Sequence, residues 1–181
     1  MLKTKIAVFV SGGGTNFEAL INAQENGKIP HGEIVLMVSS SRTAYALKRA
    51  ENHGIKSVVC SKKELGSQEK FEEEILKNLE ENDIQLIVLA GFMSILSNEF
   101  TKKYENRIIN IHPSLIPSFC GEGFYGLHVH EAALKKGVKV TGATVHIVNE
   151  IPDGGPIIMQ KAVYIEENDT PEILQKRVME Q

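Results

Sequence analysis

An asparagine and a histidine two residues apart are the most informative chemical pair in this sequence. Asn110 and His112 end an apolar stretch at residues 107–111, and Pro113 follows directly. Side chains two apart on a strand point to the same face and proline ends a strand, so we expect both to project at its carboxyl end. An amide donor beside an imidazole suits a reaction that builds an oxyanion and moves a proton. A buried, hydrogen-bonded histidine beside a turn would give the same pattern without catalysis.

A carboxylate in the turn at residues 149–156 is the second candidate. Asp153 precedes two glycines there, between two β-branched stretches. Placed against His112, it would favour the imidazolium and fix the ring. Asp followed by Gly-Gly is also ordinary turn chemistry, and the separation in sequence does not decide between these interpretations.

A glycine-rich segment, residues 11–16 (Ser-Gly-Gly-Gly-Thr-Asn), follows the first apolar run and precedes a helical pattern starting near Phe17. Glycines let a backbone approach a ligand, and the free N–H groups of a helix start attract phosphate. Thr15 and Asn16 could add hydrogen bonds or cap the helix. The segment lacks the Gly-Lys-Ser/Thr of a P-loop, and Phe17 breaks G-x-G-x-x-G. It indicates a phosphate ligand, with a capped, ligand-free turn as the alternative.

The segment after the second apolar run leaves NADP as a possible cofactor. Ser39-Ser40-Ser41-Arg42 contains no acid to hold an NAD ribose, but Arg42 and the serines suit a 2′-phosphate. An NADP reductase is therefore an alternative.

Metal and covalent chemistry have weaker support in the sequence. His128 and His130, with His112 as a third ligand, resemble a metal set, but no H-E-x-x-H or comparable acid accompanies them, so we expect no metal. Neither G-x-S-x-G nor C-x-x-C is present, and Cys60 and Cys120 lie far apart.

Short apolar runs that alternate with amphipathic stretches must position these residues. The runs at 5–10, 33–39, 84–90 and 107–111 read as buried strands, and Thr43 can cap a helix reaching His53. This alternation predicts a mostly parallel α/β sheet with helices on both faces. The stretches at 140–148 and 157–165 predict an antiparallel C-terminal edge, and Thr170-Pro171-Glu172 predicts the start of a last helix.

Size and charge bound the class of protein. The 181 residues are 42% hydrophobic and 24% charged, which fits one soluble domain. The net charge of −3 provides no basic surface for nucleic acid or an anionic membrane. The N-terminus does not look like a signal peptide and no apolar run could span a bilayer, so we expect a cytoplasmic protein.

Five segments together are similar to the folate-dependent phosphoribosylglycinamide formyltransferase family. They are residues 11–16, 89–93, 110–117, 141–146 and 153–157, in the family's order. Asn-x-His-Pro-Ser with the later Asp-Gly-Gly-Pro is specific to the wider formyltransferase group. The first loop narrows the resemblance to the ribonucleotide-binding member.

The resemblance implies a Rossmann-like domain that transfers a formyl group from 10-formyltetrahydrofolate to the amine of 5-phosphoribosylglycinamide in purine (IMP) synthesis. It implies direct attack through a tetrahedral intermediate, with no metal and two small-molecule partners. The implied catalytic residues are Asn110, His112 and Asp153. The implied phosphate-binding residues are Gly14, Thr15 and Asn16. The implied folate-binding residues are Gln68, Met93, Ser94, Ile95, Leu96, Asn110 and Val148.

Three features depart from the family's pattern. Gln68 and Ser94 stand where many relatives have a basic residue, so the anchor for the folate's glutamate tail is not identified. The loop at 118–125, rich in glycine and aromatic residues, resembles a mobile flap. The family continues beyond Gln181, so we expect a single domain over 1–181 that is truncated at its C-terminus.

Two relatives with the same catalytic trio and one protein of a different class remain as alternatives. We expect a monomer or a weak homodimer. A formyltetrahydrofolate deformylase shares the catalytic trio. A methionyl-tRNA formyltransferase also shares it, but usually adds a basic tRNA-binding domain, which this acidic chain lacks. A non-catalytic nucleotide-binding module would leave Asn110, His112 and Asp153 as structural residues.

Overall fold

The computed structural model describes residues 2–181, which fall into two compact units, the first ending at Ile108 and the second spanning Ile109–Gln181. The strands of the first unit are β1 (Thr4–Val10), β2 (Gly32–Ser39), β3 (Lys56–Val59) and β4 (Leu86–Leu89). Its helices are α1 (Thr15–Glu25), α2 (Ala46–Asn52), α3 (Lys62–Leu65), α4 (Gln68–Glu81) and α5 (Asn98–Lys103). The second unit holds β5 (Ile108–His112), α6 (Leu127–Lys136), β6 (Val140–Ile147), β7 (Ile157–Tyr164) and α7 (Pro171–Met179).

The first unit is built on a parallel sheet with strand order β3-β2-β1-β4. Its central strand β1 pairs on both edges, so that Val8 lies opposite Met37 on β2 and Val88 on β4. β1 is buried on both faces over its last five residues. Burial on both faces explains why this strand reads as a continuous apolar run rather than an alternating one.

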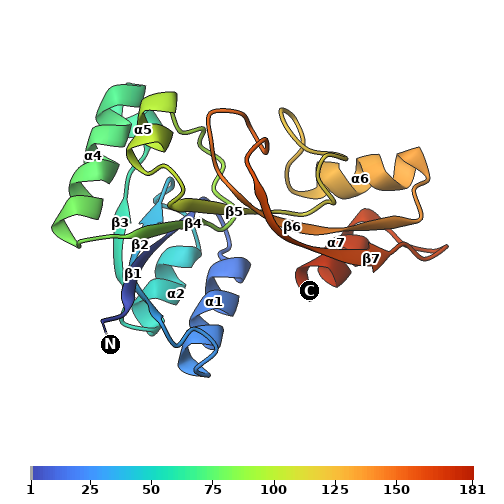
Figure 1. Cartoon of the computed structure of the whole chain (residues 1–181), viewed down its shortest axis with the longest axis horizontal. Coiled ribbons are helices and arrows are strands. Elements are labelled where there is room, and N and C mark those ends of the chain that lie inside the picture. The colour runs from blue at the N-terminus through green and yellow to red at the C-terminus, as the bar shows by residue number, and fades with distance from the viewer. Residues whose placement is uncertain (1) are drawn as a thin grey trace. The chain divides into compact units, whose positions relative to one another are not determined.

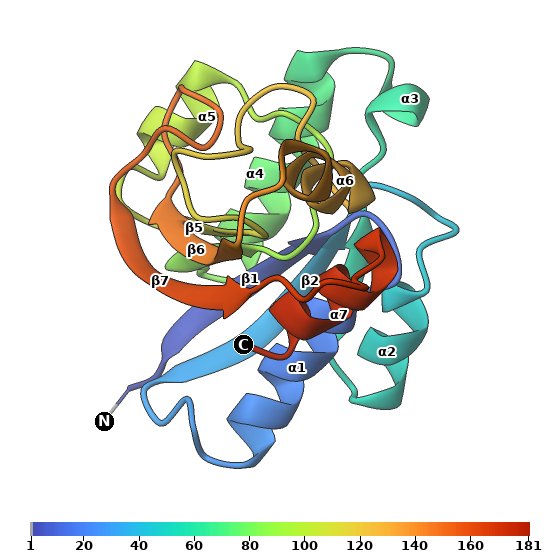
Figure 2. The same cartoon turned by 90° about the vertical axis from the view of Figure 1, so that its right-hand side faces the viewer.

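Helices cover both faces of this parallel sheet. Val8 faces α1 and α2, where Phe17 and Ala46 are fully buried in the same cluster. On the opposite face, Phe92 lies between Phe9 of β1 and Phe71 of α4, at ring-centroid distances of 5.2 and 6.5 Å. Figures 1 and 2 show α1 and α2 together on one side of the sheet and α4 on the other. The helices therefore cover the two faces as predicted.

The second unit is antiparallel. β6 pairs with β5 and β7, and α7 buries Leu174 and Val178 against Val163 of β7. Thr170 caps α7, because its hydroxyl oxygen accepts the Ile173 N–H at 3.3 Å. The predicted class, a mostly parallel α/β sheet with antiparallel C-terminal strands, is confirmed.

Two local predictions are wrong. Thr43 does not cap α2: the helix starts three residues later, and the Thr43 N–H donates to Ser41 Oγ at 3.3 Å. β3 was not predicted, because two of its four residues, Lys56 and Ser57, are polar. A single domain over 1–181 stays a prediction. Within residues 2–181, no helix combines the length and apolar character needed to cross a membrane.

Candidate functional site

Asn110, His112 and Asp153 meet in the second unit. His112 is the last residue of β5 and Asn110 precedes it by two, so one strand places both side chains. Asn110 Nδ2 lies 3.4 Å from Asp153 Oδ1, and His112 Nδ1 lies 3.4 Å from Asp153 Oδ2. The turn at 149–156 contains both an ordinary turn, in which the Gly154 N–H donates to the Ile151 carbonyl oxygen at 2.9 Å, and the contact between Asp153 and His112.

The turn that carries Asp153 is strained. Asp153 has a φ of 53°, in the left-handed region that non-glycine residues rarely adopt. Two residues later, Gly155 passes so close to β6 that a Cβ atom there would collide with the Ile147 carbonyl oxygen. Backbone strain of this kind persists where the surrounding structure holds it, often at functional sites.

The surroundings of Asp153 keep its carboxylate charged. Burial raises the pKa of Asp153, but the hydrogen bond with His146, the Gly121 N–H at 2.9 Å and the nearby His112 outweigh burial. The net result is a pKa below its usual value, so Asp153 is ionised at neutral pH.

Both ring nitrogens of His112 face acceptors. Nε2 lies 2.8 Å from the Phe119 carbonyl oxygen, which can only accept, and Nδ1 faces the Asp153 carboxylate. A ring protonated on both nitrogens satisfies both contacts at once. His112 is only 4% exposed, so water does not compete freely for these positions.

His146 is a fourth member of this cluster and was not predicted as a site residue. It is 1% exposed, and its Nδ1 lies 2.9 Å from the Ile147 carbonyl oxygen, which places a proton on Nδ1. Its Nε2 lies 3.2 Å from Asn110 Nδ2 and 3.4 Å from Asp153 Oδ1. With Nδ1 protonated, Nε2 accepts from Asn110 in the neutral ring and donates to the carboxylate in the ring protonated on both nitrogens. The signal for this contact is the antiparallel register that sets Asn110 opposite His146.

The glycine-rich segment lies in the first unit, between β1 and α1. Gly14, with a φ of 70°, is the residue before α1, and no side chain caps the helix, so of the two roles that Thr15 and Asn16 could play, capping is not the one observed. Both residues instead form the first turn of α1, with Thr15 exposed and Asn16 half-buried. This leaves the N–H groups of that turn without a side-chain cap.

Helix α2 packs directly on this loop. The Ala46 N–H donates to the Gly12 carbonyl oxygen at 3.2 Å, and Arg49 Nε donates to the Gly13 carbonyl oxygen at 2.8 Å. A Cβ atom on Gly14 would lie 2.8 Å from Ala46 Cβ. The path of the loop therefore depends on a glycine at 14 and a small residue at 46.

Gly14→Ala is expected to destabilise the protein by about 1–3 kcal/mol, because it adds a strained φ and an overlap with Ala46. Urea unfolding of the two proteins measures the difference. Gly13→Ala is the matched control, since nothing lies within 4 Å of its Cβ position and its φ is not in the left-handed region. Equal stability of the two variants would contradict this account of the loop.

A pH-sensitive network adjoins the loop. His53 bridges two carboxylates, with Nδ1 at 2.9 Å from Glu25 and Nε2 at 3.1 Å from Glu18, and Glu18 also pairs with Arg49 at 3.0 Å. The hydrogen bonds to Glu25 and then Glu18 raise the pKa of His53 above its usual 6.5.

This network predicts a pH-dependent difference in stability between the wild type and His53→Gln. The pKa of His53 is higher in the folded state, so its stabilisation is complete below about pH 6.5 and is lost as pH rises through the folded value. Thermal melts of both proteins from pH 5.5 to 9 should show the gap narrowing with rising pH. A gap that is constant or widens would contradict the prediction.

In the segment after β4, residues 93–96, hydrogen bonds fix the backbone while two apolar side chains are exposed. Met93 and Ile95 are 55% and 78% exposed, whereas Ser94 and Leu96 are half-buried. The Met93 N–H donates to Ser11 Oγ at 2.8 Å. Gln68 Nε2 donates to the Ile95 carbonyl oxygen at 3.1 Å, so the first unit brings Gln68 to the 93–96 segment.

The remaining predicted residues divide between the units. Val148 is half-buried just after β6 and, like Asn110, belongs to the second unit. The glycine-rich segment, Gln68 and 93–96 belong to the first unit.

Arg42, the candidate for an NADP phosphate, is held in an ion pair. Its Nε lies 2.9 Å from both carboxylate oxygens of Glu64, and its Nη2 lies 2.8 Å from one of them. This pairing already supplies the guanidinium with an anionic partner, so a 2′-phosphate would compete with Glu64.

The histidines once considered as metal ligands are in dissimilar settings. His128 is exposed and pairs with Glu131 at 3.0 Å, whereas His130 is fully buried on α6. Burial, and then the nearby His112, lower the pKa of His130. Among residues 2–181, no three His, Cys, Asp or Glu side chains gather as a metal-binding group. That no metal is bound stays a prediction.

The fold and the cluster together define a class of protein: an α/β protein in which an amide and an imidazole at a strand end face a half-buried carboxylate from a turn. Residues 4–181 match the formyl transferase family. The chain belongs to that family.

Named relatives agree with this assignment. The chain is 47% identical over 178 residues to the chicken (Gallus gallus) trifunctional purine biosynthetic protein adenosine-3, covering 98% of this chain and 17% of that protein. It is 38% identical to the chloroplastic phosphoribosylglycinamide formyltransferase of Arabidopsis thaliana, covering 98% of this chain and 61% of the relative. The crystal structure of phosphoribosylglycinamide formyltransferase from Bacillus halodurans matches with a TM-score of 0.90 at 41% identity, covering 98% and 88% of the two chains.

Proposed function

We propose that this chain transfers the formyl group of 10-formyltetrahydrofolate to the amine of 5-phosphoribosylglycinamide, a step of purine synthesis. The observation that carries the proposal is the cluster of Asn110, His112 and Asp153 in a chain of the formyl transferase family. The names of the relatives give the substrate. The partners are then two small molecules, and the predicted cytoplasmic location and monomeric or weakly dimeric state stay predictions.

The proposed reaction needs no acyl-enzyme. The lone pair of the glycinamide amine attacks the formyl carbon, and the carbonyl electron pair moves onto oxygen to give a tetrahedral oxyanion. Asn110 Nδ2–H and protonated His112 donate to that oxyanion. As it collapses, the bond to the folate N10 breaks, and the proton lost by the amine reaches N10 through His112 or a water molecule.

Asp153 and His146 position the two donors, His112 and Asn110. Asp153 orients His112 and balances its positive charge. Asn110 Nδ2 faces both His146 Nε2 and Asp153 Oδ1, which fixes the position of the amide, and substrate must replace one of these acceptors to receive an Asn110 N–H. His112 Nε2 donates to the Phe119 carbonyl oxygen in this structure, so substrate must replace that carbonyl as the acceptor when it binds.

Binding roles follow the family resemblance. Gly14, Thr15 and Asn16 hold the ribonucleotide 5′-phosphate, consistent with the uncapped N–H groups at the start of α1. The folate-binding residues that the resemblance implies are Gln68, Met93, Ser94, Ile95 and Leu96 in the first unit, and Asn110 and Val148 in the second. The exposed Met93 and Ile95 side chains are suited to a flat, apolar ring system.

The test is formyl transfer from 10-formyltetrahydrofolate, followed by absorbance, with and without the ribonucleotide. Turnover that requires the ribonucleotide supports the proposal. Equal folate consumption without it would make the protein a deformylase. A protein that binds the ribonucleotide without turnover would fit the non-catalytic alternative.

A further inference from the structure

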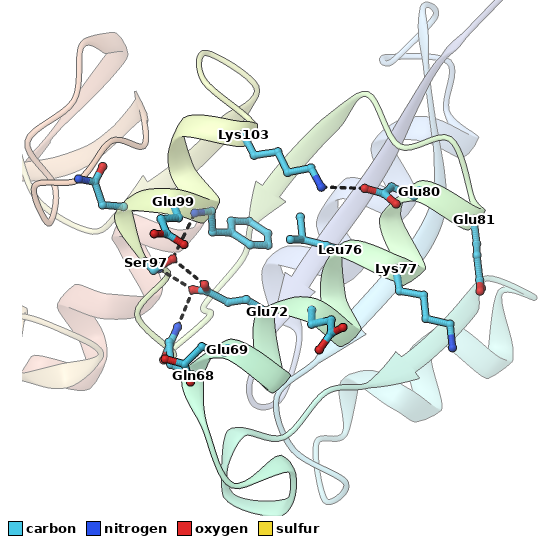
Figure 3. A pocket seen from close by; sticks show the side chains of 13 residues that line it. Gln68, Glu69, Glu72, Leu76, Lys77, Glu80, Glu81, Ser97, Glu99 and Lys103 are labelled. Carbon is cyan, nitrogen blue, oxygen red and sulfur yellow. Dashed lines mark hydrogen bonds and ion pairs between the residues drawn. The ribbon is translucent and has the colours of Figure 1, made fainter.

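A buried carboxylate on α4 contacts the end of the 93–96 segment. Glu72 is 8% exposed, and its Oε1 accepts the Ser97 N–H at 2.6 Å while its Oε2 accepts the Ser97 hydroxyl at 2.5 Å. Gln68 Nε2 donates to the same Oε1 at 2.5 Å and to the Ile95 carbonyl oxygen. Figure 3 shows Glu72 between Gln68 and Ser97, with these contacts dashed.

The charge of Glu72 is met by neutral donors. Within residues 2–181, Glu72 forms no ion pair with Lys or Arg, and its three hydrogen bonds come from an amide group, a backbone N–H and a hydroxyl. It lies at the edge of an open cavity of about 920 Å³ between α4 and α5. The same cavity is lined by further carboxylates, on Glu69, Glu73, Glu80, Glu81 and Glu99, and by two lysines, Lys77 and Lys103, of which Lys103 pairs with Glu80. A buried carboxylate without a cationic partner is costly unless its neutral donors are held in place, so these contacts require a defined position of Ser97.

Successive contacts fix the backbone on both sides of the exposed side chains. Ser11 Oγ accepts the Met93 N–H, and Gln68 Nε2 donates to the Ile95 carbonyl oxygen. Beyond the segment, the Glu72 carboxylate accepts the Ser97 N–H. The Ser97 hydroxyl also caps α5 by accepting the Phe100 N–H at 3.2 Å. A fixed backbone with exposed apolar side chains is pre-organised to bind a ligand, which lowers the entropy lost on binding.

We infer that Glu72 is a positioning residue for the formyl donor: it holds Ser97 and Gln68 so that residues 93–96 keep their binding conformation. This inference rests on the proposed function, in which these residues contact the folate. Glu72 itself does not touch the reacting atoms. Its loss should therefore weaken donor binding and leave the chemical step nearly intact.

Glu72→Gln is expected to raise the KM for 10-formyltetrahydrofolate about tenfold, because the amide cannot accept all three donors and loses the charge that strengthens them. The kcat and the KM for the ribonucleotide should change by less than about threefold, since neither depends on the 93–96 segment alone. Glu73→Gln is the matched control. Glu73 is the next residue on α4 and is exposed, so its variant should behave as the wild type.

Ser97→Ala provides a second route to the same contact. It removes the hydroxyl bond to Glu72 together with the cap of α5, and the double variant should raise the donor KM by less than the product of the two single effects. Hydrogen exchange supplies a readout apart from activity: the Ser97 amide, protected by Glu72 Oε1, should exchange at least about tenfold faster in Glu72→Gln than in Glu73→Gln. Thermal melts show whether each variant folds. If Glu72→Gln does not fold, Ser97→Ala serves as the test variant in its place.

The outcomes separate the two proposals. If the wild type does not transfer formyl to the ribonucleotide, the proposed function is wrong and the inference falls with it. If the wild type turns over and both Glu72→Gln and Ser97→Ala keep the wild-type donor KM, only the inference is wrong. A selective rise in the donor KM with faster Ser97 exchange supports it, whereas an equal loss in kcat and both KM values would overturn it in favour of a general structural role.

Discussion

Replacing His112 by alanine is expected to lower kcat by about 10²–10³-fold, the usual cost of losing one donor to a developing oxyanion. His112 is the last residue of a strand, is nearly buried, and presents both ring nitrogens to acceptors. The KM for the ribonucleotide should change little, because its phosphate is assigned to residues 14–16. Steady-state kinetics with saturating formyl donor measures both constants.

His128→Ala is the matched control for this prediction. His128 lies on α6, is exposed, and contacts the Glu131 carboxylate and the Tyr125 ring, so its loss should leave kcat within about twofold of the wild type. If His112→Ala kept more than about a tenth of the wild-type kcat, the roles proposed for the cluster would have to be abandoned.

Asp153→Asn is expected to lower kcat by about 10²–10⁴-fold, in the range typical for loss of a group that supports proton transfer. The substitution preserves the size of the side chain but removes the charge that faces His112 and weakens the contact with the Gly121 N–H. Rapid quench of a single turnover isolates this effect from product release.

Glu150→Gln controls for the turn itself. Glu150 is exposed in the same loop, so its variant should match the wild type in kcat and stability. A raised KM with an unchanged kcat in Asp153→Asn would contradict the proposed role and assign Asp153 to binding.

The sequence predicted the elements whose signals are local. The buried runs of β1 and β2, the Thr170-Pro171 start of α7 and the i, i+2 placement of Asn110 and His112 all depend on neighbours along the chain. Pro113 correctly marked the end of β5. The approach of Asp153 to His112 required a family resemblance, because no local rule brings residues 41 positions apart together.

The features that were missed depend on tertiary contacts. His146 joins the cluster through the β5–β6 register, and a shift of one residue would have turned its side chain to the other face. Thr43 fails as a cap because α2 begins where Ala46 packs on the glycine-rich loop. Glu72 looked like any other acidic residue of an amphipathic helix, and only the fold shows that its carboxylate is buried against Ser97.

The most direct test of the central claim follows the labelled carbon. The chain is mixed with 10-formyltetrahydrofolate that carries ¹³C in its formyl group and with 5-phosphoribosylglycinamide, and the products are read by ¹³C NMR. We expect the label to appear as a formamide on the ribonucleotide, at a rate that His112→Ala lowers by about 10²–10³-fold. Label released as free formate, with the ribonucleotide unchanged, would contradict it.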